Sequence, residues 1–192
     1  MTLSPSHSQT IAVIGAGPLG RNLALRSARA GFSTILEDLL PSKLRSVHEQ
    51  SAAAESLPLR YAGTIEEAVR TASLILDSVP DELESKLEIF SLLDRMAPPG
   101  AIFLSPMRAL SIADLASCTY RPELCLALEL EPKFSSDPSV TTPVTLVTTR
   151  HTQPHTAQAV REFLEALGCS VSLRTDMGEP PHEALPRPEA AR

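Results

Sequence analysis

Short apolar segments alternate along the chain with longer stretches in which apolar side chains recur at helical spacing. This alternation predicts one doubly wound α/β domain, with a mostly parallel sheet and helices on both faces. The expected strands are 11–14, 34–37, 60–62, 74–79, 101–105, 124–130, 144–148 and 170–173. The expected helices are 18–30, 41–54, a helix that begins at Thr64, 81–96, 111–118 and 153–167.

Local signals support these boundaries and set the limits of the domain. Thr64 followed by Glu67 is typical of a capping box, and Gly168 is expected to end the last helix. Residues 1–9 are polar, and residues 178–192 contain four prolines and few apolar side chains. Such segments cannot bury enough surface to offset the entropy of ordering. We therefore expect a folded domain over residues 10–177 between a disordered N-terminus (1–9) and a disordered proline-rich tail (178–192).

The sequence GAGPLG connects the first expected strand to the first expected helix. Gly15 permits a tight turn, Gly17 has no side chain where the backbone would approach a pyrophosphate, and Gly20 lets the helix pack closely on the strand. The helix N-terminus adds free N–H groups and the positive end of its dipole. The loop predicts a Rossmann-type dinucleotide site, with FAD, S-adenosylmethionine or a turn without a ligand as alternatives. The expected contacts in the loop are Gly15, Ala16, Gly17, Pro18, Leu19 and Gly20.

Asp38 follows the second expected strand, where an acidic residue completes the dinucleotide fingerprint. A carboxylate at this place can accept hydrogen bonds from both ribose hydroxyls. It also repels a phosphate on the 2′ oxygen. The sequence therefore favours NAD(H) over NADP(H) as the cofactor.

Composition limits the other partners. The net charge of −6 provides no basic surface for nucleic acid. No apolar run approaches the roughly 20 residues that a membrane-spanning helix needs. The N-terminus has neither the cationic start nor the apolar stretch of a signal peptide. We expect neither a nucleic-acid nor a membrane partner.

The cysteines and histidines provide no metal site by their spacing. Cys118, Cys125 and Cys169 form no CxxC pair, and we expect buried, reduced thiols in a cytoplasmic protein. His151 and His155 have the spacing of a chelating pair, but no Cys, Asp or Glu lies beside them at ligand spacing. A solvated start of the last helix is the expected role of these histidines.

Three segments resemble the N-terminal domain of 3-hydroxyacyl-CoA dehydrogenases, over roughly residues 10–176. They are IAVIGAGPLGRNLALRSARAGFSTILED, LRYAGTIEEAVRTASLILDSVPDELESKLEIFSLLDRMAPPGAIFLS and LSIADLASCTYRPELCLALELEP. The family binds NAD on a Rossmann-type domain and oxidises the 3-hydroxyl of an acyl-CoA. The resemblance implies that the cofactor contacts extend to Val79, Pro80, Asp81, Lys86 and Ser105. Asp81 and Lys86 are equally typical of charges on the surface of a helix start.

The catalytic set of the family is not matched. The family uses a histidine base, a glutamate that orients it, and a serine and an asparagine that bind the substrate oxygen. Arg108, Glu129 and Thr145 stand at the positions of the serine, the histidine and the glutamate. We expect Arg108 and Glu129 to form a charge-assisted pair that fills the substrate site. The alternatives are two unrelated surface substitutions, or an Arg108 that holds a substrate carboxylate.

Two larger parts of the family also lack a counterpart. Only about one helix fits between Asp38 and Arg60, where the family has a helical hairpin, and the proline-rich tail stands where the helical C-terminal domain would begin. The sequence leaves open an oxidoreductase with altered chemistry and an unknown small substrate, and a non-catalytic dinucleotide-binding sensor or partner subunit. It disfavours an active hydroxyacyl-CoA dehydrogenase. Any homo- or hetero-oligomer would use this domain, with an interface above about 1,000 Å².

Overall fold

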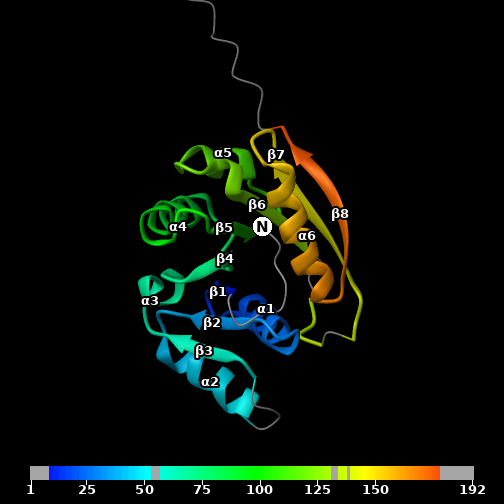
Figure 1. Cartoon of the computed structure of the whole chain (residues 1–192). Coiled ribbons are helices and arrows are strands. Elements are labelled where there is room, and N and C mark those ends of the chain that lie inside the picture. The colour runs from blue at the N-terminus through cyan, green and yellow to red at the C-terminus, as the bar shows by residue number, and fades with distance from the viewer. Residues whose placement is uncertain (1–8, 53–56, 131–133, 138, 178–192) are drawn as a thin grey trace, which may run out of the picture.

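One eight-stranded sheet forms the centre of the molecule (Figure 1). The computed structural model describes residues 9–52, 57–130, 134–137 and 139–177. The strand order is β3-β2-β1-β4-β5-β6-β7-β8, and all neighbouring pairs are parallel except β6 and β7. The strands are β1 (Thr10–Ile14), β2 (Ser33–Glu37), β3 (Leu59–Ala62), β4 (Ala72–Asp77), β5 (Ile102–Pro106), β6 (Cys125–Leu130), β7 (Thr142–Thr149) and β8 (Cys169–Asp176).

Helices cover both faces of this sheet, which confirms the doubly wound fold. α1 and α6 pack on one face, and α3, α4 and α5 pack on the other (Figure 1). The helices are α1 (Pro18–Arg29), α2 (Pro41–Ala52), α3 (Ile65–Val69), α4 (Leu83–Met96), α5 (Ile112–Ser117) and α6 (Pro154–Ala166), with a 3₁₀ turn at Pro122–Leu124. Among the described residues, no helix combines the length and the apolar character that crossing a membrane requires.

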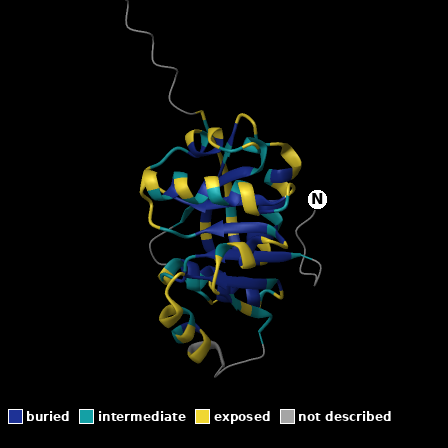
Figure 2. Ribbon diagram, turned by 90° about the vertical axis from the view of Figure 1, so that its left-hand side faces the viewer, coloured by how far each residue is buried: buried dark blue, intermediate teal, exposed yellow. Residues whose placement is uncertain are grey.

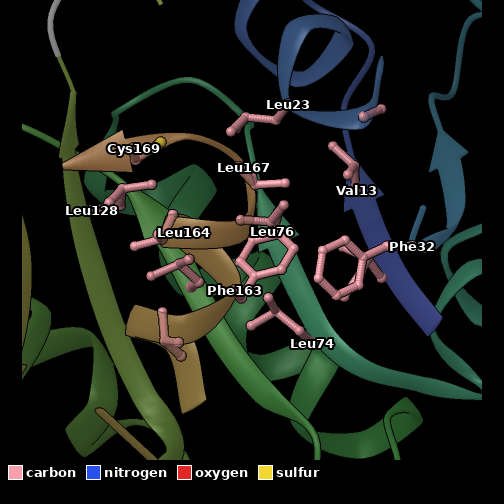
Figure 3. Close-up of a cluster of buried hydrophobic side chains, with 14 of the residues drawn as sticks. Val13, Leu23, Phe32, Leu74, Leu76, Leu128, Phe163, Leu164, Leu167 and Cys169 are labelled. Atoms are coloured by element: carbon pink, nitrogen blue, oxygen red, sulfur yellow. The ribbon is translucent and has the colours of Figure 1, made fainter. Parts of the chain in front are cut away.

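The apolar strand segments form two buried clusters, one on each face of the sheet. On the α1 and α6 face, the rings of Phe32 and Phe163 meet edge to face with their centroids 5.1 Å apart (Figure 3). The opposite face holds a similar pair, Phe90 and Phe103. Figure 2 shows the buried strands between helices whose outer surfaces are exposed. Burial on both faces explains why the strands appear in the sequence as continuous apolar runs.

Most expected boundaries agree with the structure within two or three residues, and the capping box is formed in part. The Thr64 side chain accepts a hydrogen bond from the Glu67 N–H at 3.2 Å. The Glu67 carboxylate accepts the N–H of Gly63 at 3.3 Å, one residue before the N-cap that the motif predicts. The expected disordered segments lie outside the described residues, except for Gln9.

One expectation about the cysteines is wrong. Cys125 and Cys169 are buried, and burial raises the pKa of the Cys125 thiol to about 12. Cys118 is exposed, because it lies at the C-cap of α5, on the outer side of the molecule. All three are free thiols. The cytoplasmic location that the cysteine pattern suggested stays a prediction.

Candidate dinucleotide-binding site

A cavity of about 550 Å³ lies at the carboxyl ends of β1, β2 and β4. The strand order reverses between β1 and β4, and ligands of open α/β sheets bind at such a switch point. Its volume is in the usual range for ligand pockets. Its lining residues are Ile14, Gly15, Gly17, Pro18, Glu37, Asp38, Leu39, Leu40, Lys43, Ile65, Ser78, Val79, Pro80 and Ile89.

The glycine loop has the geometry that a pyrophosphate site requires. Gly15 has a φ of +98°, which residues with a side chain rarely adopt. A Cβ on Gly20 would lie 1.9 Å from the Gly15 carbonyl oxygen, so only glycine fits there. A Cβ on Gly17 would meet nothing within 4 Å, so open space lies over this residue at the start of α1. The first-turn N–H groups of α1 have no acceptor within the helix, and the open space leaves room for an anion beside them.

Asp38 connects residues at the rim of this cavity through its carboxylate oxygens. One carboxylate oxygen accepts the Ala16 N–H at 2.8 Å and the Lys43 ammonium at 3.1 Å, and the other accepts the Leu40 N–H at 2.8 Å. Burial tends to raise the pKa of Asp38, but the hydrogen bonds from Leu40, Ala16 and Lys43 outweigh burial and lower it. Asp38 is therefore an anion that touches both the glycine loop and α2.

Glu37 is a second acidic side chain in the cavity, and no sequence pattern indicated a role for it. Glu37 is 2% exposed, and its Oε1 atom has no hydrogen-bond partner in the part of the chain that the structure describes. Burial, with a smaller effect from Asp38, raises the pKa of Glu37 to about 7. An acidic residue as the last residue of a strand gives no sign of burial in the sequence, because its environment depends on the helices that pack over it.

Lys86 and Ser105, expected near the cofactor, form a buried cluster with Asp77, the last residue of β4. The Lys86 ammonium lies 2.9 Å from Asp77 Oδ2 and 3.0 Å from Ser105 Oγ, and Ser105 donates to the same carboxylate oxygen at 2.9 Å. The Lys86 and Ser105 side chains are completely buried. The alternative that Lys86 is a surface charge at the start of α4 is therefore wrong. The cluster ties α4 to the ends of β4 and β5.

A second cavity, of about 230 Å³, lies at the carboxyl ends of β5 and β6. Asp81 borders it and accepts the N–H groups of Arg108 at 2.9 Å and Ala109 at 3.3 Å. Asp81 thus fixes the backbone of the loop that follows β5. The residues that line this cavity are Leu19, Val79, Asp81, Pro106, Met107, Arg108, Leu128 and Leu130.

The expected ion pair between Arg108 and Glu129 is not formed. The Arg108 guanidinium donates to the Leu130 carbonyl oxygen at 2.9 Å. Glu129 instead pairs with Arg174 of β8. The prediction was wrong because it did not take account of β8, whose parallel pairing with β7 brings Arg174 to Glu129. Both residues still border one small cavity at this end of the sheet.

Thr145 stands at the position of the family's orienting glutamate, directly opposite Glu129 in the antiparallel pair of β6 and β7. Its hydroxyl lies 3.0 Å from the Ser172 hydroxyl of β8. The three positions of the catalytic set therefore do lie at one end of the sheet. However, Arg108 donates to a carbonyl oxygen, Glu129 pairs with an arginine, and Thr145 lies beside a serine hydroxyl.

Comparison with known proteins identifies the family. The family described as "3-hydroxyacyl-CoA dehydrogenase, NAD binding domain" matches residues 47–175, which is more than half of the chain. The chain belongs to this family. The match begins after the glycine loop, so the geometry of the loop and of Asp38 is independent support for NAD as the cofactor of this 3-hydroxyacyl-CoA dehydrogenase NAD-binding domain.

Two bacterial dehydrogenases are similar in sequence to this chain, in agreement with this family. An L-carnitine dehydrogenase of Pseudomonas sp is 26% identical over 177 residues, which cover 85% of this chain and 54% of that protein. A 3-hydroxybutyryl-CoA dehydrogenase of Bradyrhizobium diazoefficiens is 27% identical over 182 residues, with 86% of this chain and 61% of that protein covered. This NAD-binding domain thus spans between half and two thirds of the length of these relatives.

Solved structures share the fold of this NAD-binding domain. The crystal structure of a 3-hydroxyacyl-CoA dehydrogenase from Archaeoglobus fulgidus has a TM-score of 0.75 at 24% identity and covers 89% of this chain and 58% of that chain. A diketoreductase structure has a TM-score of 0.76 at 24% identity, with 88% of this chain and 65% of that chain covered. The family's hairpin between β2 and β3 is reduced, since α2 is the one helix among the described residues of this interval.

Proposed function

We propose that this domain binds NAD(H) across the two cavities, with the glycine loop at the pyrophosphate and Asp38 at the adenosine ribose. The observation that supports this most directly is the open space over Gly17, which lines the larger cavity at the start of α1. Val79 lines both cavities, and Pro80 and Asp81 follow it. The proposed contacts are Gly15, Ala16, Gly17, Pro18, Leu19, Gly20, Asp38, Val79, Pro80 and Asp81. Lys86 and Ser105 are buried in contact with Asp77, so they act as positioning residues that fix the end of β4 and do not touch the cofactor themselves.

The same geometry favours NAD(H) over NADP(H). Asp38 is an anion with a lowered pKa, and it would stand beside a phosphate on the 2′ oxygen of the ribose. Among the residues that the structure describes, Lys43 is the one cation that lines the larger cavity, and its charge is already paired with Asp38.

NAD, when bound, supplies a carbon that accepts or donates a hydride, and the protein must supply the proton transfer. In the family that role belongs to a histidine, and here Glu129 at its position is held by Arg174. The Asp81 carboxylate is engaged with two backbone N–H groups. We infer that this domain does not carry out the alcohol oxidation of the family, and that its dehydrogenase chemistry is altered or lost.

An oxidoreductase that acts on a small anionic substrate is the second candidate. Arg108 lines the smaller cavity. Among the described residues, its guanidinium donates to the Leu130 carbonyl oxygen and pairs with no carboxylate. A guanidinium that is not paired with a carboxylate of the protein can bind a substrate carboxylate with two parallel hydrogen bonds. A non-catalytic sensor or a partner subunit requires no such anchor.

Titration calorimetry with NAD+ and with NADH, followed by an assay for reduction of acetoacetyl-CoA, tests the proposal. We expect binding of NAD(H), and turnover at least about 10²- to 10⁴-fold below that of a family enzyme, as for loss of a general base. Turnover at the family's rate would contradict the proposed loss of chemistry. Absence of NAD(H) binding by the folded protein would contradict the proposed site.

A further inference from the structure

Glu37 is the last residue of β2, and its side chain lies against the apolar part of the larger cavity. The lining side chains of this part come from β1, α3, α4 and the segment after β4, and they are Ile14, Ile65, Ile89, Val79 and Pro80. Leu39 and Leu40, at 80% and 53% exposure, complete the rim. Two exposed leucines beside a buried carboxyl group are suited to a flat ring that is apolar on its faces and polar at its edge.

The carboxyl group of Glu37 lacks the partner that buried polar groups normally have. Its Oε1 atom is buried and has no hydrogen-bond partner among the described residues. Leaving such a group unsatisfied costs free energy, so proteins retain it mainly where a ligand or another function requires it. The charged groups that line the same cavity are Asp38 and Lys43, and they are paired with each other. α3 and α4 contribute only Ile65 and Ile89 to this lining.

The protonation state of Glu37 decides what it can bind. With a pKa of about 7, raised by burial and by Asp38, the group is protonated in a large part of the molecules near neutral pH. A protonated carboxyl group has one O–H donor and one carbonyl acceptor side by side. The edge of adenine offers the complementary pair, an amino donor next to a ring-nitrogen acceptor.

We propose that the carboxylic acid of Glu37 recognises the adenine ring of NAD(H), accepting a hydrogen bond from the exocyclic amino group and donating its O–H to the adjacent ring nitrogen. This inference rests on the proposed binding of NAD(H) in the same cavity. Asp38 then binds the ribose while Glu37 specifies the base, so the two neighbouring acids divide the adenosine between them. Ionised Glu37 has no donor, and its charge would lie beside the ring nitrogen, so cofactor affinity depends on pH.

The test measures NAD+ affinity by calorimetry for the full chain and for Glu37→Gln, Glu37→Val and Glu49→Gln, from about pH 6 to about pH 9. Because ligand binding requires the protonated acid, the wild-type dissociation constant should rise about tenfold per pH unit above the pKa, or about 100-fold in total. Glu37→Gln keeps a donor and an acceptor without titrating, so its affinity should stay near the wild-type value at low pH throughout. Glu49→Gln removes an exposed charge from α2 outside the cavity and should behave as wild type.

An ethenoadenine analogue of NAD+, in which a bridge removes the amino donor, gives the second readout. Wild type at low pH should bind the analogue at least about tenfold more weakly than NAD+, whereas Glu37→Val should bind both within about twofold. A wild-type affinity that does not change with pH, or equal discrimination by wild type and Glu37→Val, overturns the role of Glu37. If the folded wild-type protein binds no NAD+ at any pH, the proposed function itself fails.

Discussion

The Lys86 ammonium lies 2.9 Å from Asp77 Oδ2, and both side chains are almost completely shielded from solvent. Ser105 bridges the same two groups, so one buried cluster joins α4 to the ends of β4 and β5. A buried ion pair is strongly destabilised when one partner is removed, since the remaining charge has no counterion. Lys86 therefore stabilises the end of β4, and Ser78 and Val79, which follow that strand, line the proposed cofactor site.

We predict that Lys86→Met lowers the free energy of unfolding by about 3–5 kcal/mol, measured by urea denaturation. The control is Glu165→Gln, which breaks an exposed pair with Arg161 on α6 and should cost less than about 0.5 kcal/mol. A loss below about 1 kcal/mol for Lys86→Met would show that Asp77 does not depend on this ammonium.

Alanine substitutions at Gly17 and Gly20 should have different effects, the first on cofactor binding and the second on folding. A Cβ at Gly17 meets nothing within 4 Å, and Gly17 is the N-cap of α1, where glycine is preferred over alanine, so Gly17→Ala should cost no more than about 1 kcal/mol of unfolding free energy. It should nevertheless weaken NADH binding, because the methyl group enters the space assigned to the pyrophosphate. A Cβ at Gly20 meets the Gly15 carbonyl oxygen at 1.9 Å, so Gly20→Ala should destabilise the fold itself. Unchanged NADH affinity in Gly17→Ala would place the pyrophosphate elsewhere.

Asp38→Ala should reduce the preference for NADH over NADPH by about tenfold or more. The substitution removes the anion that would repel the 2′-phosphate of NADPH and the acceptor that would bind the ribose hydroxyls of NADH. It also releases Lys43, which lies 3.1 Å from the carboxylate and can then pair with a phosphate. Titrating both cofactors into Asp38→Ala and into the double variant Asp38→Ala/Lys43→Ala measures the two effects. The double variant should bind NADPH more weakly than the single one. Tighter binding of NADPH than of NADH by the wild type would contradict the assignment of Asp38.

Glu37 should make the folded state less stable as the pH rises. Its pKa is raised from 4.5 to about 7 in the folded protein, so folding retains a proton that the unfolded chain releases in this interval. Relative to Glu37→Gln, wild type should therefore lose about 3 kcal/mol of stability between pH 4.5 and about pH 7, and little more above that. Urea denaturation of both proteins at several pH values gives this difference. A difference that does not change with pH would show that Glu37 titrates normally when folded.

Features that depend on residues close together in the chain could be predicted without the structure. The alternation of apolar strands with helical stretches predicted the doubly wound sheet, since both faces of such strands are buried. The glycine loop and Asp38 were predicted because the conformation of a strand–turn–helix unit is set by its own residues. The part-formed capping box at Thr64 has the same local origin.

Tertiary structure alone decided which side chains are buried and which partners they have. Glu129 pairs with Arg174 because β8 lies beside β7, and no pattern near Glu129 indicates that register. No sequence pattern indicates that Lys86 and Glu37 are buried, yet both are buried in the folded chain. Within the described part of the chain, Lys86 meets an opposite charge and Glu37 does not, so their effects on stability and binding depend on distances that only the folded chain sets.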